Sequence, residues 1–247
     1  MKKTLIALMA LAGVAAADIT TITTEWNFDN NLTSTGSVVT TGSWVKGQDG
    51  LTEATYGVDD VYGSYLVLDG KGYVKVNNTY WSTGSGTLAL GSNDTSFTIS
   101  ATVMFDSIPS EIFLMGTSNN HDEGFAFTLM DGKLALTAKS IAHNTLNSMT
   151  ALTADTWYTL GVSYDAETNV ANFSVNGNSV GTLTLSSGYD AAEAVGMAIG
   201  AGGADQAQGV WSGKIANLSI TTTVPEPTTA TLSLLALAGL AARRRRK

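Results

Sequence analysis

The chain has 247 residues, of which 14% are charged, 26 are glycine, three are proline and none is cysteine. Its formal net charge is −8, but seven of the thirteen cations lie at the two ends, so residues 18–227 carry six lysines against twenty-one acidic residues, a balance of −15. This acidic body excludes nucleic acid as a partner, because phosphate binding requires a cationic face, and the lack of cysteine excludes disulfides and thiolate metal sites.

The first predicted element is a short apolar segment at the N-terminus. Two lysines precede an apolar run from Leu5 to Val14, and three alanines follow it. This layout is typical of a secretory signal peptide and predicts residues 1–17 as that peptide, with cleavage after Ala17. A core helix is the alternative, but the run is short, lacks a cap and has cations in front of it. We therefore expect an exported protein.

Apolar and polar residues then alternate along many short segments. The pattern is clearest in SFTISATVMF (96–105), WYTLGVSY (157–164) and VANFSVNG (170–177). Alternation with a period of two predicts strands that bury one face. About ten to fourteen such strands are expected, which is enough for two stacked antiparallel sheets.

Turn residues separate the alternating segments. Asp-Gly or Asn-Gly pairs begin at Asp69, Asp131 and Asn176. Each pair predicts a tight hairpin, because these residues adopt positive φ readily.

The last predicted element is a 15-residue apolar stretch, residues 228–242, followed by four arginines and a lysine. As a helix it would span about 22 Å, less than the ~30 Å of a hydrocarbon core. The cations behind it would stay in the cytoplasm and leave the body outside. Just before it stand Val224, Pro225, Glu226 and Pro227.

This C-terminal arrangement resembles the PEP-CTERM sorting signal of exported bacterial proteins. In that family a membrane-embedded exosortase cuts near the motif and releases the body to the outer surface or the exopolysaccharide matrix. The resemblance implies residues 224–247 as the sorting signal, an exosortase-type membrane protease as partner and transient anchoring in the inner membrane. It also implies a mature protein without residues 228–247. A permanent single-span anchor is the alternative.

The alternating segments, in their order, resemble the laminin-G-like domains of the concanavalin A-like jelly-roll superfamily. The most specific part is WYTLGVSYDAETNVANFSVNG (157–177), and the closing segment WSGKIANLSI (211–220) matches the family's last strand. The resemblance implies an all-β, two-sheet antiparallel jelly-roll sandwich over residues 18–223, with the last strand near the first. It places Trp26 and Trp157 in the core.

Catalytic residues are not expected. A retaining glycosidase needs two carboxylates roughly 5 Å apart, and the E-x-D-x-E pattern of the superfamily's glucanases is absent. Asp165 and Glu167 have suitable spacing but lie in the predicted turn YDAETN. His121 and His143 lie in predicted loops without a G-x-S-x-G motif. An exported glycan-active hydrolase stays the alternative.

Three tryptophans are candidate ligand-binding residues. Exposed aromatic rings can stack on sugar rings beside polar hydrogen-bonding groups. Trp44, Trp81 and Trp211 lie in Gly- and Ser-rich surroundings that predict loops. The alternative is that these rings pack over the ends of the sandwich.

Calcium is the candidate cofactor. Asp29, Asn30 and Asn31 follow the first predicted strand and offer the hard oxygen ligands that Ca²⁺ prefers. The spacing of an EF-hand loop is absent, so solvated turn residues are the alternative.

Taken together, the sequence predicts an exported, non-catalytic protein of the cell surface or extracellular matrix. Its sandwich is expected to bind carbohydrate or another protein as an adhesion or structural module, with extracellular polysaccharide or surface glycan as the candidate ligand. A coat component without a specific ligand is equally consistent with the sequence, because a fold alone does not assign a function.

Overall fold

The computed structural model describes residues 19–76, 95–117, 126–138, 141–185, 197–203 and 207–225. Residues Thr21–Val224 form one compact unit, and the terminal segments Met1–Thr20 and Pro225–Lys247 form another. The described residues hold sixteen strands and no helix, which confirms the predicted all-β class. The sixteen strands exceed the predicted ten to fourteen, because strands as short as β2 (Thr35–Gly36) and β15 (Met197–Ile199) are too brief to show alternation.

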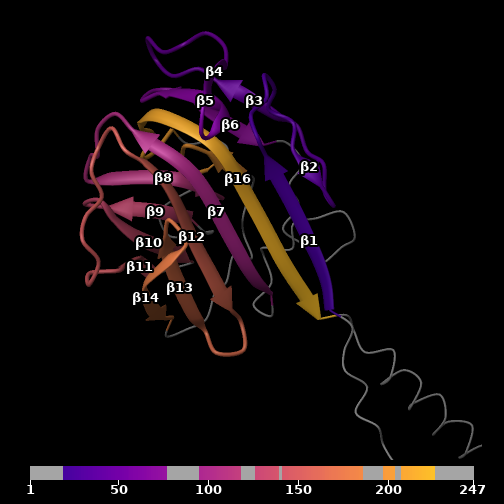
Figure 1. Ribbon diagram of the computed structural model, residues 1–247, viewed down its shortest axis with the longest axis vertical. Coiled ribbons are helices and arrows are strands. Elements are labelled where there is room, and N and C mark those ends of the chain that lie inside the picture. The colour runs from indigo at the N-terminus through magenta and orange to yellow at the C-terminus, as the bar shows by residue number, and fades with distance from the viewer. Residues whose placement is uncertain are drawn as a thin grey trace, which may run out of the picture. The chain divides into compact units, whose positions relative to one another are not determined.

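The larger sheet contains nine strands (Figure 1). Seven follow one another in the order β14-β13-β12-β7-β16-β1-β2, and β5 pairs with the first part of β16 and with β4. The last strand therefore lies beside the first. The other bounds are β1 (Ile19–Trp26), β4 (Thr55–Asp59), β5 (Gly63–Asp69), β7 (Ser96–Phe105), β12 (Trp157–Asp165), β13 (Val170–Val175), β14 (Asn178–Thr184) and β16 (Ser212–Pro225).

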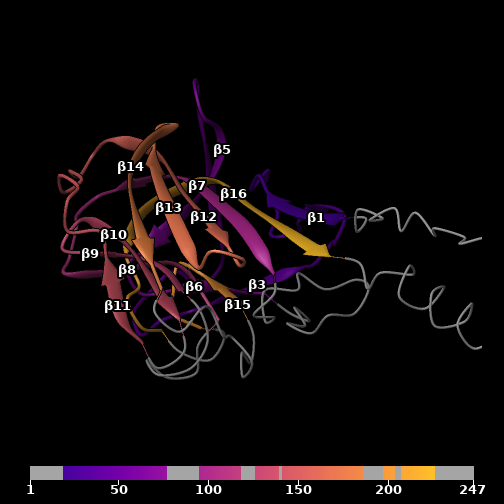
Figure 2. The same cartoon turned by 90° about the horizontal axis from the view of Figure 1, so that it is seen from below.

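The smaller sheet contains seven antiparallel strands in the order β11-β10-β9-β8-β15-β6-β3. It packs against the larger sheet, and the two layers form a jelly-roll sandwich (Figure 2). The other bounds are β3 (Gly42–Val45), β6 (Tyr73–Val76), β8 (Glu111–Gly116), β9 (Ala126–Met130), β10 (Lys133–Ala138) and β11 (Ile141–Thr145).

The hydrophobic core lies between the two sheets and follows the alternation in the sequence. In β7, every second residue from Phe97 to Phe105 is buried, while the residues between them are half-buried or exposed. Trp26 is fully buried, as predicted. Because the inward positions are apolar, the outward positions of the same strands are left to polar residues.

Two of the three predicted hairpins are confirmed. Asp131-Gly132 joins β9 to β10 and Asn176-Gly177 joins β13 to β14, each as a two-residue loop in which both residues have positive φ. The hairpin predicted at Asp69-Gly70 is wrong. Its flanking strands, β5 and β6, belong to different sheets, so the turn carries the chain from one layer to the other.

The hairpin of β4 and β5 projects from the larger sheet, on the side away from the smaller one (Figure 2). Its strands pair from Thr55 and Val67 to Asp59 and Gly63, which leaves a three-residue loop. Gly63 has a φ of +76°. This conformation favours glycine and lets the loop close tightly.

Candidate functional site

The outer face of the larger sheet carries mainly hydroxyl and amide side chains. Two hydroxyl pairs link neighbouring strands, since the Oγ1 atoms of Thr102 and Thr159 lie 3.2 Å apart and those of Thr23 and Thr221 lie 3.1 Å apart. The outward hydroxyl, amide and carboxyl residues of the central strands include Ser96, Thr98, Ser100, Thr102, Thr159, Ser163, Asp165, Asn172, Ser174, Asn217, Ser219, Thr221 and Thr223.

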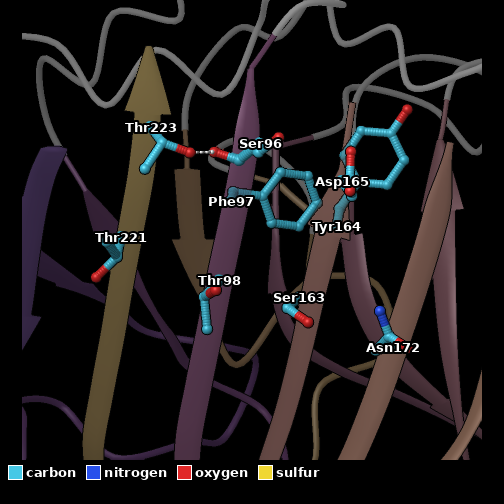
Figure 3. A pocket seen from close by; sticks show the side chains of 9 residues that line it. All are labelled: Ser96, Phe97, Thr98, Ser163, Tyr164, Asp165, Asn172, Thr221 and Thr223. Carbon is cyan, nitrogen blue, oxygen red and sulfur yellow. Dashed lines mark hydrogen bonds between the residues drawn. The ribbon is translucent and has the colours of Figure 1, made fainter. Parts of the chain in front are cut away.

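An open groove of about 290 Å³ crosses one end of this face, over β16, β7, β12 and β13 (Figure 3). Two hydrogen bonds join its strands at the rim. The hydroxyl of Thr223 donates to the carbonyl of Ser96 at 3.2 Å, and the backbone N–H of Ala166 donates to Oγ of Ser96 at 3.0 Å. The groove is lined by Ser96, Phe97, Thr98, Ser163, Tyr164, Asp165, Asn172, Thr221 and Thr223.

Two aromatic residues belong to the lining of the groove, but their rings face the core. Phe97 and Tyr164 are each 2% exposed, and they stack with centroids 5.3 Å apart and planes inclined by 27°. The hydroxyl of Tyr164 donates to Oδ1 of Asn169 at 2.8 Å, which fixes the ring. The groove thus presents mainly polar side chains to a ligand.

Among the described residues, the lining of the groove contains one carboxylate, that of Asp165. Its Oδ1 accepts the backbone N–H groups of Glu167 at 2.8 Å and of Thr168 at 3.2 Å, so it caps the turn after β12. Glu167 is exposed in that turn and is not part of the lining. The groove therefore offers hydrogen-bonding groups for a ligand, and its described lining holds no second carboxylate beside Asp165 of the kind that a retaining glycosidase uses.

Three aromatic residues gather at the opposite end of β12, on the same outer face. The ring of Trp157 stacks with that of Tyr62, with centroids 4.8 Å apart and planes inclined by 26°. It also meets Tyr65 edge to face, at 6.0 Å and 62°. The Nζ atom of Lys214 lies 5.0 Å from the centroid of the Tyr65 ring. We call Tyr62, Tyr65 and Trp157 the aromatic cluster.

Asp59 holds the loop that carries Tyr62. Its Oδ1 accepts the backbone N–H groups of Val61 at 2.9 Å and Tyr62 at 3.1 Å. These two hydrogen bonds, the first above all, lower the pKa of Asp59, and a side-chain hydrogen bond from Trp157 acts in the same direction. The carboxylate thus links the hairpin loop to β12.

Two of the three candidate tryptophans, Trp44 and Trp211, lie among the described residues, and both pack on the core. Trp211 is only 1% exposed, packs on Phe105 with centroids 4.9 Å apart, and donates from Nε1 to the carbonyl of Phe113 at 3.0 Å. Its prediction as an exposed loop residue is therefore wrong, because its ring fills the core. Trp44 is half-buried against the core and donates to the carbonyl of Leu51 at 3.0 Å. Trp81 lies outside the described residues.

Trp157 was expected in the core, and this expectation is also wrong. It is half-buried on the outer face, where it contacts the aromatic residues of the hairpin. The alternation itself carried the correct signal, because Tyr158 and Leu160 have inward positions and Trp157 must then point outward.

The predicted calcium ligands lie in an exposed turn after Phe28. Asn31 donates to the carbonyl of Asp29 at 2.8 Å and accepts the N–H of Thr33 at 2.8 Å, and Oδ1 of Asp29 accepts from Ser64 at 3.3 Å. Asn30 has a φ of +53°. No three His, Asp or Glu side chains converge on a metal position within the described ranges. Calcium binding at Asp29, Asn30 and Asn31 stays a prediction.

The remaining sequence features lie at or beyond the limits of the described residues. β16 ends at Pro225, so Glu226, Pro227 and the apolar stretch lie outside, as do the N-terminal segment of residues 1–17 and His121. Nothing is described of the His143 side chain. In the described part of the chain, no helix has the length and apolar character needed to cross a bilayer.

Comparisons with known families agree with this architecture. Residues 68–229 match the laminin-G family model described as the concanavalin A-like lectin/glucanases superfamily. Residues 223–247 match the PEP-CTERM protein-sorting motif. No curated protein matches the sequence significantly.

Several solved structures share the fold. Domain 4 of AbnA, an extracellular GH43 arabinanase from Geobacillus stearothermophilus in complex with arabinotriose, aligns with a TM-score of 0.60 and 18% identity over 85% of this chain and 96% of that domain. The binding domain of botulinum neurotoxin DC, in complex with rat synaptotagmin II, aligns with a TM-score of 0.50 and 11% identity over 82% of this chain and 46% of the other. At such identities the likeness shows the jelly-roll fold alone.

Proposed function

The chain belongs to the concanavalin A-like lectin/glucanases superfamily and ends in a PEP-CTERM protein-sorting motif. From these two premises we propose that it is an exported, non-catalytic protein of the cell surface or extracellular matrix. Its sandwich binds carbohydrate through the outer face of the larger sheet.

The chemistry of the groove carries this proposal. Hydroxyl groups and the amide of Asn172 can donate to and accept from the hydroxyls of a sugar. The carboxylate of Asp165 already accepts two hydrogen bonds from its own turn. A site of this kind supports binding, whereas glycoside hydrolysis by the two-carboxylate mechanism needs a second acid nearby.

The second part of the proposal concerns how the chain is sorted and processed at its C-terminus. The C-terminal motif supports recognition by an exosortase-type membrane protease, transient anchoring in the inner membrane and removal of residues 228–247. Intact-mass spectrometry of the native protein tests this step. A mass that includes the arginine tail would favour a permanent anchor.

The binding function is tested with residues 18–223 on a glycan array, beside an assay for polysaccharide cleavage. Arabinotriose is a suitable first probe, because the arabinanase domain of the same fold was solved with it. We expect saturable binding without release of products. Product release would instead support an exported glycan-active hydrolase.

A further inference from the structure

We infer that the aromatic cluster is a sugar-stacking subsite, in which the exposed ring of Tyr62 takes the apolar face of one ring of a neutral polysaccharide. This inference rests on the proposed carbohydrate-binding function and names the residues and the ligand class. It also gives a role to the β4–β5 hairpin, whose residues do not line the groove.

The tip of the hairpin exposes apolar side chains that the fold does not need. Val58 is 74% exposed, Val61 is 80% exposed and Tyr62 is 41% exposed, and they are three of the four large hydrophobic residues exposed in the described part of the chain. Apolar groups gathered on a projecting element mark a contact surface. The hairpin tip is therefore placed to meet a ligand.

The ring of Tyr62 is held in place before any ligand arrives. One of its faces stacks on Trp157, and the loop beneath it is fixed by Asp59 and by the positive φ of Gly63. A ring that is already ordered loses little conformational entropy on binding. Tyrosine also offers a hydroxyl at its edge, so one residue supplies both the apolar surface and a hydrogen bond.

Polar partners for the sugar hydroxyls surround the cluster. Asp59 ends β4 directly before the loop, and Lys214 lies over the ring of Tyr65. Aromatic surface beside a few polar groups is the chemistry that sugar recognition requires. The charge balance of −15 over residues 18–227 repels polyanions, so we assign neutral polysaccharide rather than an acidic one.

The cluster and the groove lie along one line of the sheet. Trp157 and Ser163 belong to the same strand and point to the same face, and six residues of strand span about 20 Å. Between them the outward positions are Thr159 and Gly161, and the hydroxyl of Ser174 fills the space over the glycine, so the path between the two ends is lined by small polar groups. The surface thus suits a chain ligand that reaches from the cluster to the groove.

The test uses the full chain, purified in a mild detergent, and affinity electrophoresis against four polysaccharides: arabinan, xylan, mixed-linkage β-glucan and polygalacturonate. We compare the wild type with Tyr62→Ala, Tyr62→Trp and a matched control, Val39→Ala, at an exposed valine in another loop. For at least one neutral polysaccharide we expect Tyr62→Ala to weaken binding about tenfold. Tyr62→Trp and Val39→Ala should bind within about twofold of the wild type.

The outcomes distinguish failure of the subsite from failure of the carbohydrate-binding function on which it rests. Equal binding by Tyr62→Ala and Val39→Ala would overturn the subsite and leave the carbohydrate-binding function standing. Binding of polygalacturonate alone would overturn the neutral ligand class. Failure of the wild type to bind any of the four would overturn both proposals. Thermal melting of each variant checks that Tyr62→Ala is folded, which we expect because the residue lies at a projecting tip.

Discussion

Tyr62 and Trp157 stack with their ring centroids 4.8 Å apart, although one lies in the loop between β4 and β5 and the other begins β12. This contact joins a projecting hairpin to the middle of the larger sheet. It places an aromatic surface on a face that otherwise carries mainly hydroxyl and amide groups. The same strand that starts at the cluster ends at the groove, so one element positions both parts of the candidate site.

Trp157→Ala should loosen the hairpin without unfolding the sandwich. The half-buried ring contributes two aromatic contacts, so we expect a loss of about 1–2 kcal/mol in the free energy of unfolding. Hydrogen exchange should become faster at the amides of Val61 and Tyr62, while the amides of β7 keep their protection. Trp157→Phe should keep most of the protection. Unchanged exchange at the loop would show that the stack does not hold the hairpin.

Trp211→Ala should damage the fold far more. The ring is buried in the core, and its loss leaves a cavity and removes the hydrogen bond from Nε1 to the carbonyl of Phe113. Removal of a buried tryptophan costs about 3–5 kcal/mol. Chemical denaturation of the two tryptophan variants, side by side, measures the difference. A smaller loss for Trp211→Ala than for Trp157→Ala would contradict the placement of Trp211 in the core.

These two residues show what the sequence could predict. The alternation of apolar residues located β7, β12 and β13 and their core faces, because burial of one face leaves a clear period of two. The parity that placed Leu160 and Val162 inward also placed Trp157 outward, and Ile215 likewise indicates an inward Trp211. Trp211 was predicted from the composition around it and Trp157 from its position in the family. Both kinds of evidence were weaker than this parity.

The sheet change at Asp69 could not be predicted in the same way. Its side chain accepts backbone N–H groups from Lys71 and Gly72, as in an ordinary tight turn, and also from Leu51. Local turn chemistry is the same whether the next strand returns to its own sheet or crosses to the other. The aromatic cluster escaped prediction for a related reason, because it joins segments that are far apart in the chain.

Gly57→Ala should disturb the cluster from the opposite strand of the hairpin. The ring of Tyr65 lies over Gly57, and an added methyl group would clash with Cζ and Oη of that ring. Tyr65 must then move away from Trp157 and Lys214. We expect a loss of about 1 kcal/mol in stability and shifted NMR resonances for the Trp157 indole. An unchanged indole resonance would show that Tyr65 does not sit as described.

The hairpin loop should tolerate mild acid. Hydrogen bonds from Val61 and Tyr62 lower the pKa of Asp59 below its ordinary value of 3.8. A carboxyl group whose pKa is lower in the folded state stabilises that state above its unfolded pKa, and this stabilisation is lost as the pH falls through the lowered value. The Trp157 indole N–H resonance should therefore titrate with a midpoint below 3.8, and this titration should vanish in Asp59→Asn. A midpoint above 3.8 would contradict the described hydrogen bonds.

The most direct test is to block the groove on the outer face of the larger sheet and measure carbohydrate binding. In the double variant Ser163→Arg and Asn172→Arg, two long side chains cover the groove. The control is Ser43→Arg, which adds one such side chain at an exposed position of β3 in the smaller sheet. On a glycan array, with product release followed in parallel, we predict that the wild type and Ser43→Arg bind the same glycans without cleaving them and that the double variant loses binding. Equal binding by the double variant, or no binding by the wild type, would contradict a sugar-binding outer face.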